Sequence, residues 1–204
     1  MLFAIALFAC STEPAETPQP QPQAPVAEAP APAVAGMALE SGQINLVQLK
    51  SGTAEVPATF ATPKGTLNVD GTGSFEIDLG SWDSQLELRD SRVQELFFKA
   101  PEHPKATFTL ISSEGLKTDI AVGESSPATL KGELSLYAGK TPVEIPATLT
   151  HNTDGSFQLA TTQPFQISIE SLGLNENLQV LMKVCAHESI GDAVDVSFDF
   201  KLKG

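Results

Sequence analysis

From Met37 onward, apolar and polar residues alternate along the chain with a period of two. Such alternation is typical of strands that bury one face and expose the other. In the last alternating segment, Val194, Val196 and Phe198 share one face, while Asp195 and Ser197 share the opposite face. The pattern predicts strands at 42–50, 53–61, 65–69, 73–80, 105–112, 128–137, 142–151, 155–161, 164–170 and 193–203.

The connections between most of these segments are short and carry turn sequences such as Asp70-Gly71 and Asp154-Gly155. Short connections favour antiparallel neighbours. Strands with one apolar face must either close into a barrel or stack as a sandwich. The sequence therefore predicts an all-β domain, and alternation alone leaves both architectures open.

Residues 82–98 break the alternation, because their apolar positions approach helical spacing. The segment contains two capping-box sequences, Ser84-Gln85-Leu86-Glu87 and Ser91-Arg92-Val93-Gln94. Pro101 stops any helix that begins here. We expect one short helix in this region.

A second helix is expected at 176–186, where Leu178, Met182 and Cys185 share a face. Its cysteine is interpreted as an unreactive core thiol. One or two short helices at an end of the β-domain are therefore expected.

The N-terminal residues 2–9 form an unbroken apolar run that ends immediately before Cys10. Such a run is too short to span a membrane and fits the apolar region of a secretory signal. Leu7-Phe8-Ala9-Cys10 resembles a bacterial lipobox, in which the cysteine thiol receives a diacylglyceryl group. We expect 1–9 to be a signal peptide whose true start lies further upstream. The alternative is an unprocessed apolar N-terminus with an incidental cysteine.

Residues 11–36 contain seven prolines and seven alanines. Proline prevents regular hydrogen bonding, and the segment has too little apolar surface to offset the entropy of ordering. Residues 10–36 are therefore predicted to be a lipidated cysteine followed by a disordered, Pro/Ala-rich tether. The folded domain is expected to occupy 37–204.

The net charge is −13, from 12 basic and 25 acidic residues. Such a chain repels phosphate backbones, which excludes nucleic acid as a favoured partner. His103, His151 and His187 are scattered without metal-ligand spacing, and no nucleophile, base and orienting group are brought together. We predict no enzyme activity, no metal and no cofactor.

A longer pattern starts at Ser81-Trp82-Asp83-Ser84-Gln85-Leu86-Glu87-Leu88-Arg89-Asp90. It continues through Phe97-Phe98, Pro104 and Phe108, then Gly132-Glu133-Leu134-Ser135-Leu136, and later Gly173 and the strand from Val194. Over about residues 40–203 this pattern resembles the YceI-like family. The resemblance implies an elongated, lipocalin-like antiparallel barrel of about eight strands. It also implies export to the periplasm or cell envelope, and binding of a polyisoprenoid or similar amphiphile in the lumen.

The chain departs from the family pattern at three places. Residues 60–65 lack a histidine that many members carry, Glu170-Ser171 stands where an arginine is usual, and Tyr137-Ala138 replaces a hydroxyl or histidine position. These departures leave the fold expectation intact and the identity of the ligand open.

Strand parity and the family pattern together give the candidate lumen residues. They are Phe75, Ile77, Phe97, Phe108, Leu110, Leu134, Leu136, Ile167 and Phe198. Phe97 and its neighbour Phe98 are expected to face opposite ways. Arg89 and Arg92 are candidates for the ligand head group, since guanidinium suits a pyrophosphate or carbonyl. The competing interpretation of these arginines is a local salt bridge with Asp90 that fixes the helix start.

The leading hypothesis is a protein held in a bacterial membrane by acylated Cys10. Its barrel would carry or buffer an isoprenoid-like lipid, such as a quinone or a polyprenyl tail. The alternative is a structural or interaction β-domain on a stalk that binds no lipid. A homodimer is left open.

Overall fold

The structure is a computed structural model that describes residues 36–50 and 52–204. Ten strands form one antiparallel sheet in the order β2-β1-β3-β4-β5-β6-β7-β8-β10-β9. The strands are β1 Gly36–Lys50, β2 Ala54–Phe60, β3 Lys64–Asn68, β4 Gly73–Asp78, β5 Lys105–Glu114, β6 Ser125–Leu136, β7 Gly139–His151, β8 Phe157–Thr161, β9 Phe165–Ser168 and β10 Ile190–Lys203. The helical segments are η1 Leu79–Ser81, α1 Glu87–Arg92, η2 Val93–Phe97 and α2 Asn175–Cys185. All ten predicted strands are present.

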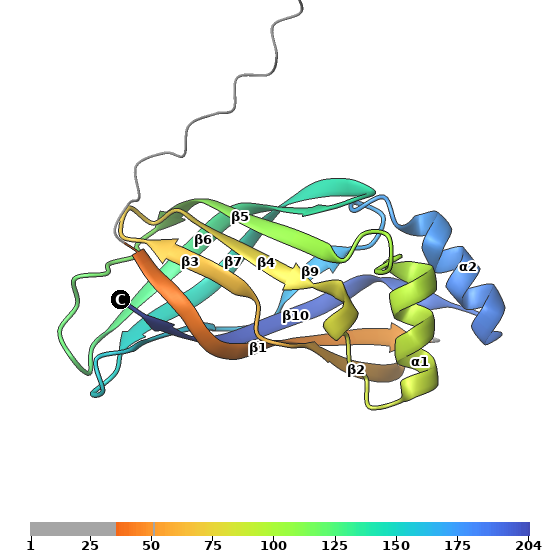
Figure 1. Cartoon of the computed structure of the whole chain (residues 1–204), viewed down its shortest axis with the longest axis horizontal. Coiled ribbons are helices and arrows are strands. Elements are labelled where there is room, and N and C mark those ends of the chain that lie inside the picture. The colour runs from red at the N-terminus through yellow and green to blue at the C-terminus, as the bar shows by residue number, and fades with distance from the viewer. Residues whose placement is uncertain (1–35, 51) are drawn as a thin grey trace, which may run out of the picture. The chain divides into compact units, whose positions relative to one another are not determined.

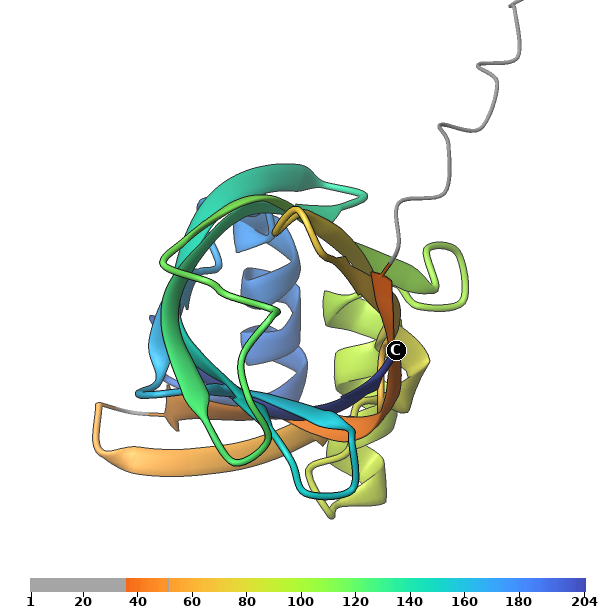
Figure 2. The same cartoon turned by 90° about the vertical axis from the view of Figure 1, so that its left-hand side faces the viewer.

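The sheet closes on itself because β1 pairs with β10 along nearly its whole length, from Ala38↔Lys203 to Lys50↔Ile190. The closed ring consists of eight strands, namely β1, β3 to β8 and β10. Figure 2 shows this ring end-on, with the helices behind it. The predicted lipocalin-like barrel is therefore confirmed, and the sandwich is excluded.

The strand β1 is longer than predicted, because it begins at Gly36 and not at residue 42. Its first residues pair with β3, whereas residues from Ile44 onward pair with β2. Gly42 lies between these two pairings with φ +140°. A Cβ at this position would lie 2.2 Å from the carbonyl oxygen of Asp199, so only glycine fits. The strand can therefore bend from one partner to the next.

One end of the barrel is filled by leucine side chains. Leu67, Leu110, Leu149 and Leu202 are each at most 1% exposed. They come from four different strands, so this layer spans the interior. Close packing of this kind leaves little void at this end.

The other end carries the helices, which lie together at the right of Figure 1. Asn177 of α2 donates a hydrogen bond to the carbonyl oxygen of Phe97 at 2.6 Å. Gln94 of η2 donates to the carbonyl oxygen of Trp82 at 2.9 Å. These side-chain bonds fix α2 against η2, and η2 against the loop that follows η1.

The helix predicted at 176–186 is confirmed, but the capping boxes expected in 82–98 are wrong. The first helix begins at Glu87, and its preceding residue makes no side-chain cap bond. Ser84 instead gives both its backbone NH and its hydroxyl to the Asp90 carboxylate. Ser91 lies inside α1, where its hydroxyl donates to the carbonyl oxygen of Leu88.

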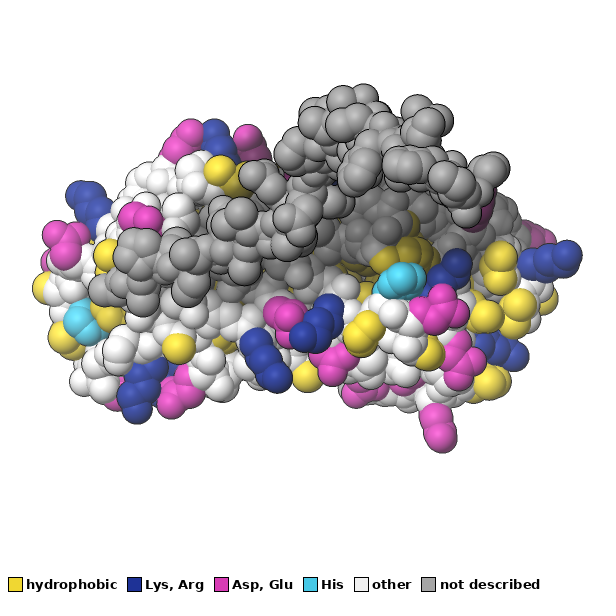
Figure 3. Space-filling view, turned by 45° about the horizontal axis from the view of Figure 1, so that its top comes forward, with side chains coloured by type: hydrophobic (Ala, Val, Ile, Leu, Met, Phe, Trp, Pro, Cys, Tyr) yellow, Lys and Arg dark blue, Asp and Glu magenta, His cyan; other side chains and the backbone are white. Residues whose placement is uncertain are grey.

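No helix within the described ranges is long and apolar enough to cross a membrane. Charged side chains of both signs are scattered over the part of the surface that grey atoms leave visible in Figure 3, and apolar side chains gather among them toward the helix end. Five of the exposed large apolar residues belong to that end: Leu49, Leu86, Leu88, Val180 and Val184. The surface is therefore least polar where the helices lie.

Candidate ligand-binding site

The barrel interior contains a cavity of about 160 Å³. Every side chain that lines it is apolar, including residues from both sides of the barrel such as Ile44, Phe75, Ile145 and Phe198. None of the four leucines that fill the opposite end contributes to it. The cavity therefore occupies the part of the lumen that lies toward the helices, and it offers a ligand burial without hydrogen bonding.

The structure places eight of the nine candidate lumen residues on the cavity wall. These are Phe75, Ile77, Phe97, Phe108, Leu134, Leu136, Ile167 and Phe198. Leu110 is not among the lining residues, and it is 1% exposed in the packed end of the barrel. Its inward direction was predicted correctly, but alternation does not give a position along the barrel axis.

Sequence analysis did not identify the aromatic cluster at the helix end of the cavity. Trp82 lies 5.4 Å from Phe60 and 5.5 Å from Phe98, measured between ring centroids. Phe97 lies 4.9 Å from Phe98. Both phenylalanines are buried and both line the cavity, so the expectation that they face opposite ways is wrong. Both residues lie at the end of the helical region, in η2 and its C-cap, where consecutive side chains do not project to opposite faces as they do in a strand.

The size of the cavity limits what the barrel holds without rearrangement. An apolar cavity of about 150 Å³ in another protein stays dry and binds benzene. The present cavity is of that size, which corresponds to a single isoprene unit of five carbons. A longer chain requires wall side chains to move, and half-buried wall residues such as Phe108, Leu136 and Ile167 are less constrained by packing than the fully buried ones.

A second pocket of about 290 Å³ lies against the ends of β1 and β2 and both helices. Trp82 and Phe97 line this pocket and also the apolar cavity, so the two spaces share these residues as a wall. The polar part of its lining includes Lys50, Arg89 and Arg92. The two arginines that sequence analysis singled out therefore lie at the border of the lumen.

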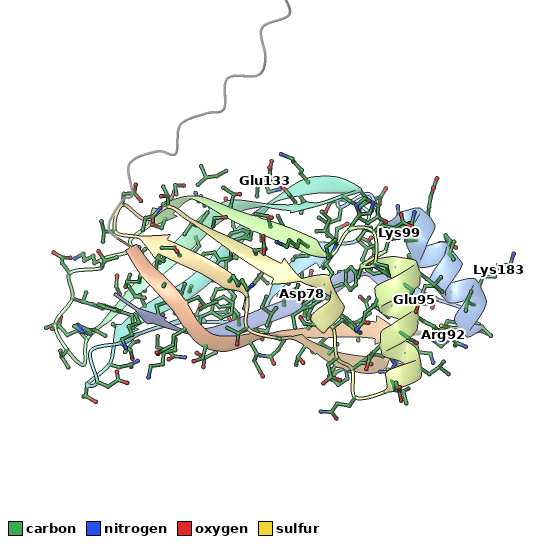
Figure 4. The ribbon with its side chains drawn as sticks, viewed as in Figure 1. Asp78, Arg92, Glu95, Lys99, Glu133 and Lys183 are labelled. Atoms are coloured by element: carbon green, nitrogen blue, oxygen red, sulfur yellow. The ribbon has the colours of Figure 1, made fainter. Side chains whose placement is uncertain are left out.

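The local salt bridge proposed for these arginines is absent among the described residues. Asp90 uses one carboxylate oxygen to accept both hydrogen bonds from Ser84. Arg92 instead extends toward α2, where its Nη1 lies 3.6 Å from the Sγ of Cys185 (Figure 4). Asp90 thus fixes the start of α1 through hydrogen bonds, and neither guanidinium group has a carboxylate partner within residues 36–50 and 52–204.

Cys185 and His187 complete the second pocket, and sequence reasoning did not connect them with it. Cys185 is half-buried at the end of α2, so it packs against the core without belonging to its buried part. Burial lowers the pKa of His187, and the positive charges of Lys50, Arg89 and Arg92 lower it further. All three cations therefore lie close enough to the His187 imidazole to disfavour its protonation.

The other histidines lie elsewhere. His103 stacks on Tyr137, with ring centroids 4.3 Å apart. His151 contacts the carbonyl oxygen of Ile120 through Nδ1 at 2.9 Å. Across residues 36–50 and 52–204, no group of three His, Cys, Asp or Glu side chains could hold a metal ion. Cys10, the predicted site of acylation, lies outside the described residues.

An eight-stranded barrel with an apolar lumen and helices at one end defines a lipocalin-like class of fold. The model of the YceI-like domain matches residues 40–202. The chain therefore belongs to the YceI-like domain family. A comparison with the sequences of curated proteins gave no match.

Solved structures share this fold at low sequence identity. A polyisoprenoid binding domain from Saccharophagus degradans, implicated in plant cell wall breakdown, superposes with a TM-score of 0.75 and 18% identity. The match covers 82% of this chain and 98% of that domain. BcnA of Burkholderia cenocepacia gives 0.60 at 15% identity, over 78% of this chain and 95% of that one. The Campylobacter jejuni YceI protein gives 0.56 at 15% identity, over 74% and 86%.

Proposed function

We propose that this protein binds the chain of an isoprenoid-like lipid, such as a polyprenyl or quinone tail, in its barrel and acts as a carrier or buffer. The observation that carries this proposal is the cavity lined only by apolar side chains. The polyisoprenoid binding domain of the same fold supports the choice of ligand class.

The apolar wall gives a simple expectation for affinity. Burial of one CH₂ group contributes about 0.8 kcal/mol, so a five-carbon isoprene unit contributes at most about 4 kcal/mol. This corresponds to roughly three orders of magnitude in Kd. Rearrangement of the wall reduces the gain for each further unit. Affinity should therefore rise with chain length and then level off.

We further propose that the protein works at a bacterial membrane in the periplasm or cell envelope, with acylated Cys10 as its anchor and residues 11–35 as its tether. A diacylated cysteine anchors firmly, whereas a single acyl chain holds only marginally. The Pro/Ala-rich segment would give the domain reach from the membrane surface.

The proposal is tested on the full-length protein purified from its native membranes without detergent. We expect native mass spectrometry to show a bound lipid, and organic extraction to release an isoprenoid. The variant Ala106→Leu adds three carbons at the cavity wall, so it should carry less bound lipid than the wild type. If the wild-type protein carries no lipid and takes up none from isoprenoid-containing vesicles, the carrier proposal is refuted. The alternative, a structural or interaction domain on a stalk, would then replace it.

A further inference from the structure

The end of the barrel that carries the helices exposes a group of large apolar side chains. Eight large apolar residues in the described ranges are exposed, and five of them belong to this end. The other three are Val69 in the turn between β3 and β4, Ile111 in β5, and Val122 in the loop between β5 and β6. Single exposed apolar residues are ordinary, whereas a group of them at one end marks a contact surface. We call this group the helix-end face; it consists of Leu49, Leu86, Leu88, Val180 and Val184.

These side chains are apolar beyond what the packing of the helices on the barrel requires. The helix α2 buries Leu178 and Leu181. Val180 and Val184 are one turn apart, so they share a face of α2, and each is about half exposed. The short helix α1 buries none of its residues, and Leu88 within it is 61% exposed. The core therefore does not account for the apolar residues of this face.

The helices also lack the acidity of the protein as a whole, which has a net charge of −13. Together, α1 and α2 carry three acidic and three basic residues, so they have no net charge. These residues are Glu87, Asp90 and Glu176, and Arg89, Arg92 and Lys183. Figure 4 shows Lys183 pointing away from the barrel at this end. An anionic bilayer repels an acidic surface, so a surface without net charge approaches it at a smaller electrostatic cost.

The helix-end face is too small for a stable interface with another protein. Such an interface buries about 800 Å² and about 20–30 residues on each partner. Five apolar side chains, each about half exposed, supply only a small part of that area. A bilayer requires no complementary shape, and its boundary between head groups and acyl chains accepts apolar side chains to a depth of about 5–10 Å. The size of the face therefore favours a lipid surface.

The helix-end face lies opposite the point where the N-terminal segment joins the barrel. Gly36, the first residue of β1, pairs with Asn68, next to Leu67 of the leucine-filled end, and the helices lie at the other end (Figure 1). The 14 residues of β10 span at most about 46 Å, whereas residues 11–35 in extended form reach about 80 Å. A barrel anchored through Cys10 can therefore turn its helix end to the same membrane, where the high local concentration makes a weak contact sufficient.

We propose that the helix-end face docks on the surface of a lipid bilayer and inserts its apolar side chains between the head groups and the acyl chains. This orientation brings Trp82 and Phe97, the wall that the second pocket shares with the apolar cavity, toward the lipids of the membrane. The inference rests on the proposed function for the anchor that holds the protein near the membrane. The docking surface itself is separate from the anchor and from the lumen.

The test uses Trp82, the only tryptophan of the chain, which lines the second pocket together with Leu86 and Leu88. The full-length protein is mixed with increasing amounts of phosphatidylethanolamine and phosphatidylglycerol vesicles, with and without bromine on the acyl chains. Bromine quenches tryptophan fluorescence only at short range, so quenching reports contact of the helix end and not of the anchor. We expect the brominated vesicles to quench Trp82, and the lipid dependence gives the equilibrium constant for docking.

The variant L86Q/L88Q removes two apolar side chains and keeps a high helix propensity. We expect the equilibrium constant for docking to fall about tenfold or more, because two half-exposed leucines no longer enter the bilayer. The matched control I111Q/V122Q removes a similar exposed apolar area away from the helices, so it should stay within twofold of wild type. Should L86Q/L88Q fail to fold, V180T/V184T tests the face from α2, with an expected loss of about threefold.

The outcomes separate docking from lipid uptake, since a brominated lipid inside the lumen would also quench Trp82. Ala106→Leu narrows the cavity without changing the helix-end face, so it should keep the quenching. Quenching that Ala106→Leu abolishes and L86Q/L88Q leaves intact would overturn docking and support a lipid in the barrel. Absence of quenching in the wild type would overturn docking alone, because native mass spectrometry tests the bound isoprenoid independently. A dimer that L86Q/L88Q dissociates, seen by sedimentation in place of quenching, would make the face a contact between two copies.

Discussion

The substitution Ala106→Leu is expected to stabilise the ligand-free protein, whereas Ala147→Leu is expected to destabilise it. Both alanines are buried, at 3% and 1% exposure, Ala106 at the start of β5 and Ala147 within β7. Ala106 lines the cavity and Ala147 does not. The same three carbons therefore enter empty space in one case and a packed interior in the other.

The magnitudes follow from this difference. Three buried carbons contribute about 2.4 kcal/mol, and the lost rotamer freedom of leucine removes about 0.5–1 kcal/mol. The net gain at Ala106 is then about 1.5 kcal/mol. Overpacking at Ala147 should cost about 1–3 kcal/mol. For a domain of this size, about 2–4 °C in Tm accompanies each kcal/mol, so the two variants should move Tm in opposite directions.

The assay is urea unfolding of delipidated protein, followed by circular dichroism, with Trp82 fluorescence to measure farnesol binding. Ala106→Leu should weaken farnesol binding about tenfold or more, because it removes apolar volume that the ligand needs. Ala147→Leu should leave that affinity within twofold of wild type. Equal destabilisation by both substitutions would show that the lumen is packed throughout in solution, and the carrier hypothesis would lose its basis.

Three further predictions concern the anchor, an ion pair and the bend in β1. Cys10→Ala should move the native gene product from the membrane to the soluble fraction and abolish labelling by an alkyne fatty acid; unchanged fractionation would contradict acylation. A hydrogen bond from a neighbouring serine hydroxyl, and then one from Lys201, hold the pKa of Asp154 below its ordinary value of 3.8. The resulting stabilisation is complete above about pH 4 and is lost as the pH falls through the folded-state pKa, so Asp154→Asn should reduce the drop in Tm between pH 5 and pH 2. Gly42→Ala should destabilise by several kcal/mol, because its Cβ would meet backbone at 2.2 Å, whereas Gly191→Ala meets nothing closer than 3.4 Å and should be nearly neutral in urea unfolding.

The strands could be predicted from the sequence because each depends on a local rule. Half-buried strands show alternation within a few residues, as in the run from Val194 to Leu202. Closure of the barrel has no such local sign, since it depends on pairing between β1 and β10 at opposite ends of the domain. The family resemblance, and not the alternation, indicated a barrel.

The candidate site, like the fold, could be predicted only where a local sequence pattern indicates it. Parity identified most of the cavity wall, but it did not separate Leu110 in the packed end from Phe108 on the wall two residues earlier. Ser84 matched a capping box, yet its backbone NH and its hydroxyl donate to the carboxylate of Asp90, six residues later. Arg89 and Arg92 could be singled out by the chemistry of their guanidinium groups, whereas only the fold brings Lys50 and His187 into the same pocket. No local sequence signal connects Lys50 at the end of β1 with His187, which follows α2.

The two ends of the barrel are closed by different interactions, and we expect a ligand to enter at the helix end. At the leucine-filled end, a path would require four buried side chains, Leu67, Leu110, Leu149 and Leu202, to leave their packing. At the helix end, the seal consists of aromatic contacts and of single side-chain bonds, from Asn177 to Phe97 and from Gln94 to Trp82. Each such bond contributes only about 1 kcal/mol net, and displacement of α2 would also expose the buried side chains of Leu178 and Leu181, so fewer buried residues are disturbed here than at the leucine-filled end. The second pocket lies on this path, and it shares Trp82 and Phe97 with the apolar cavity.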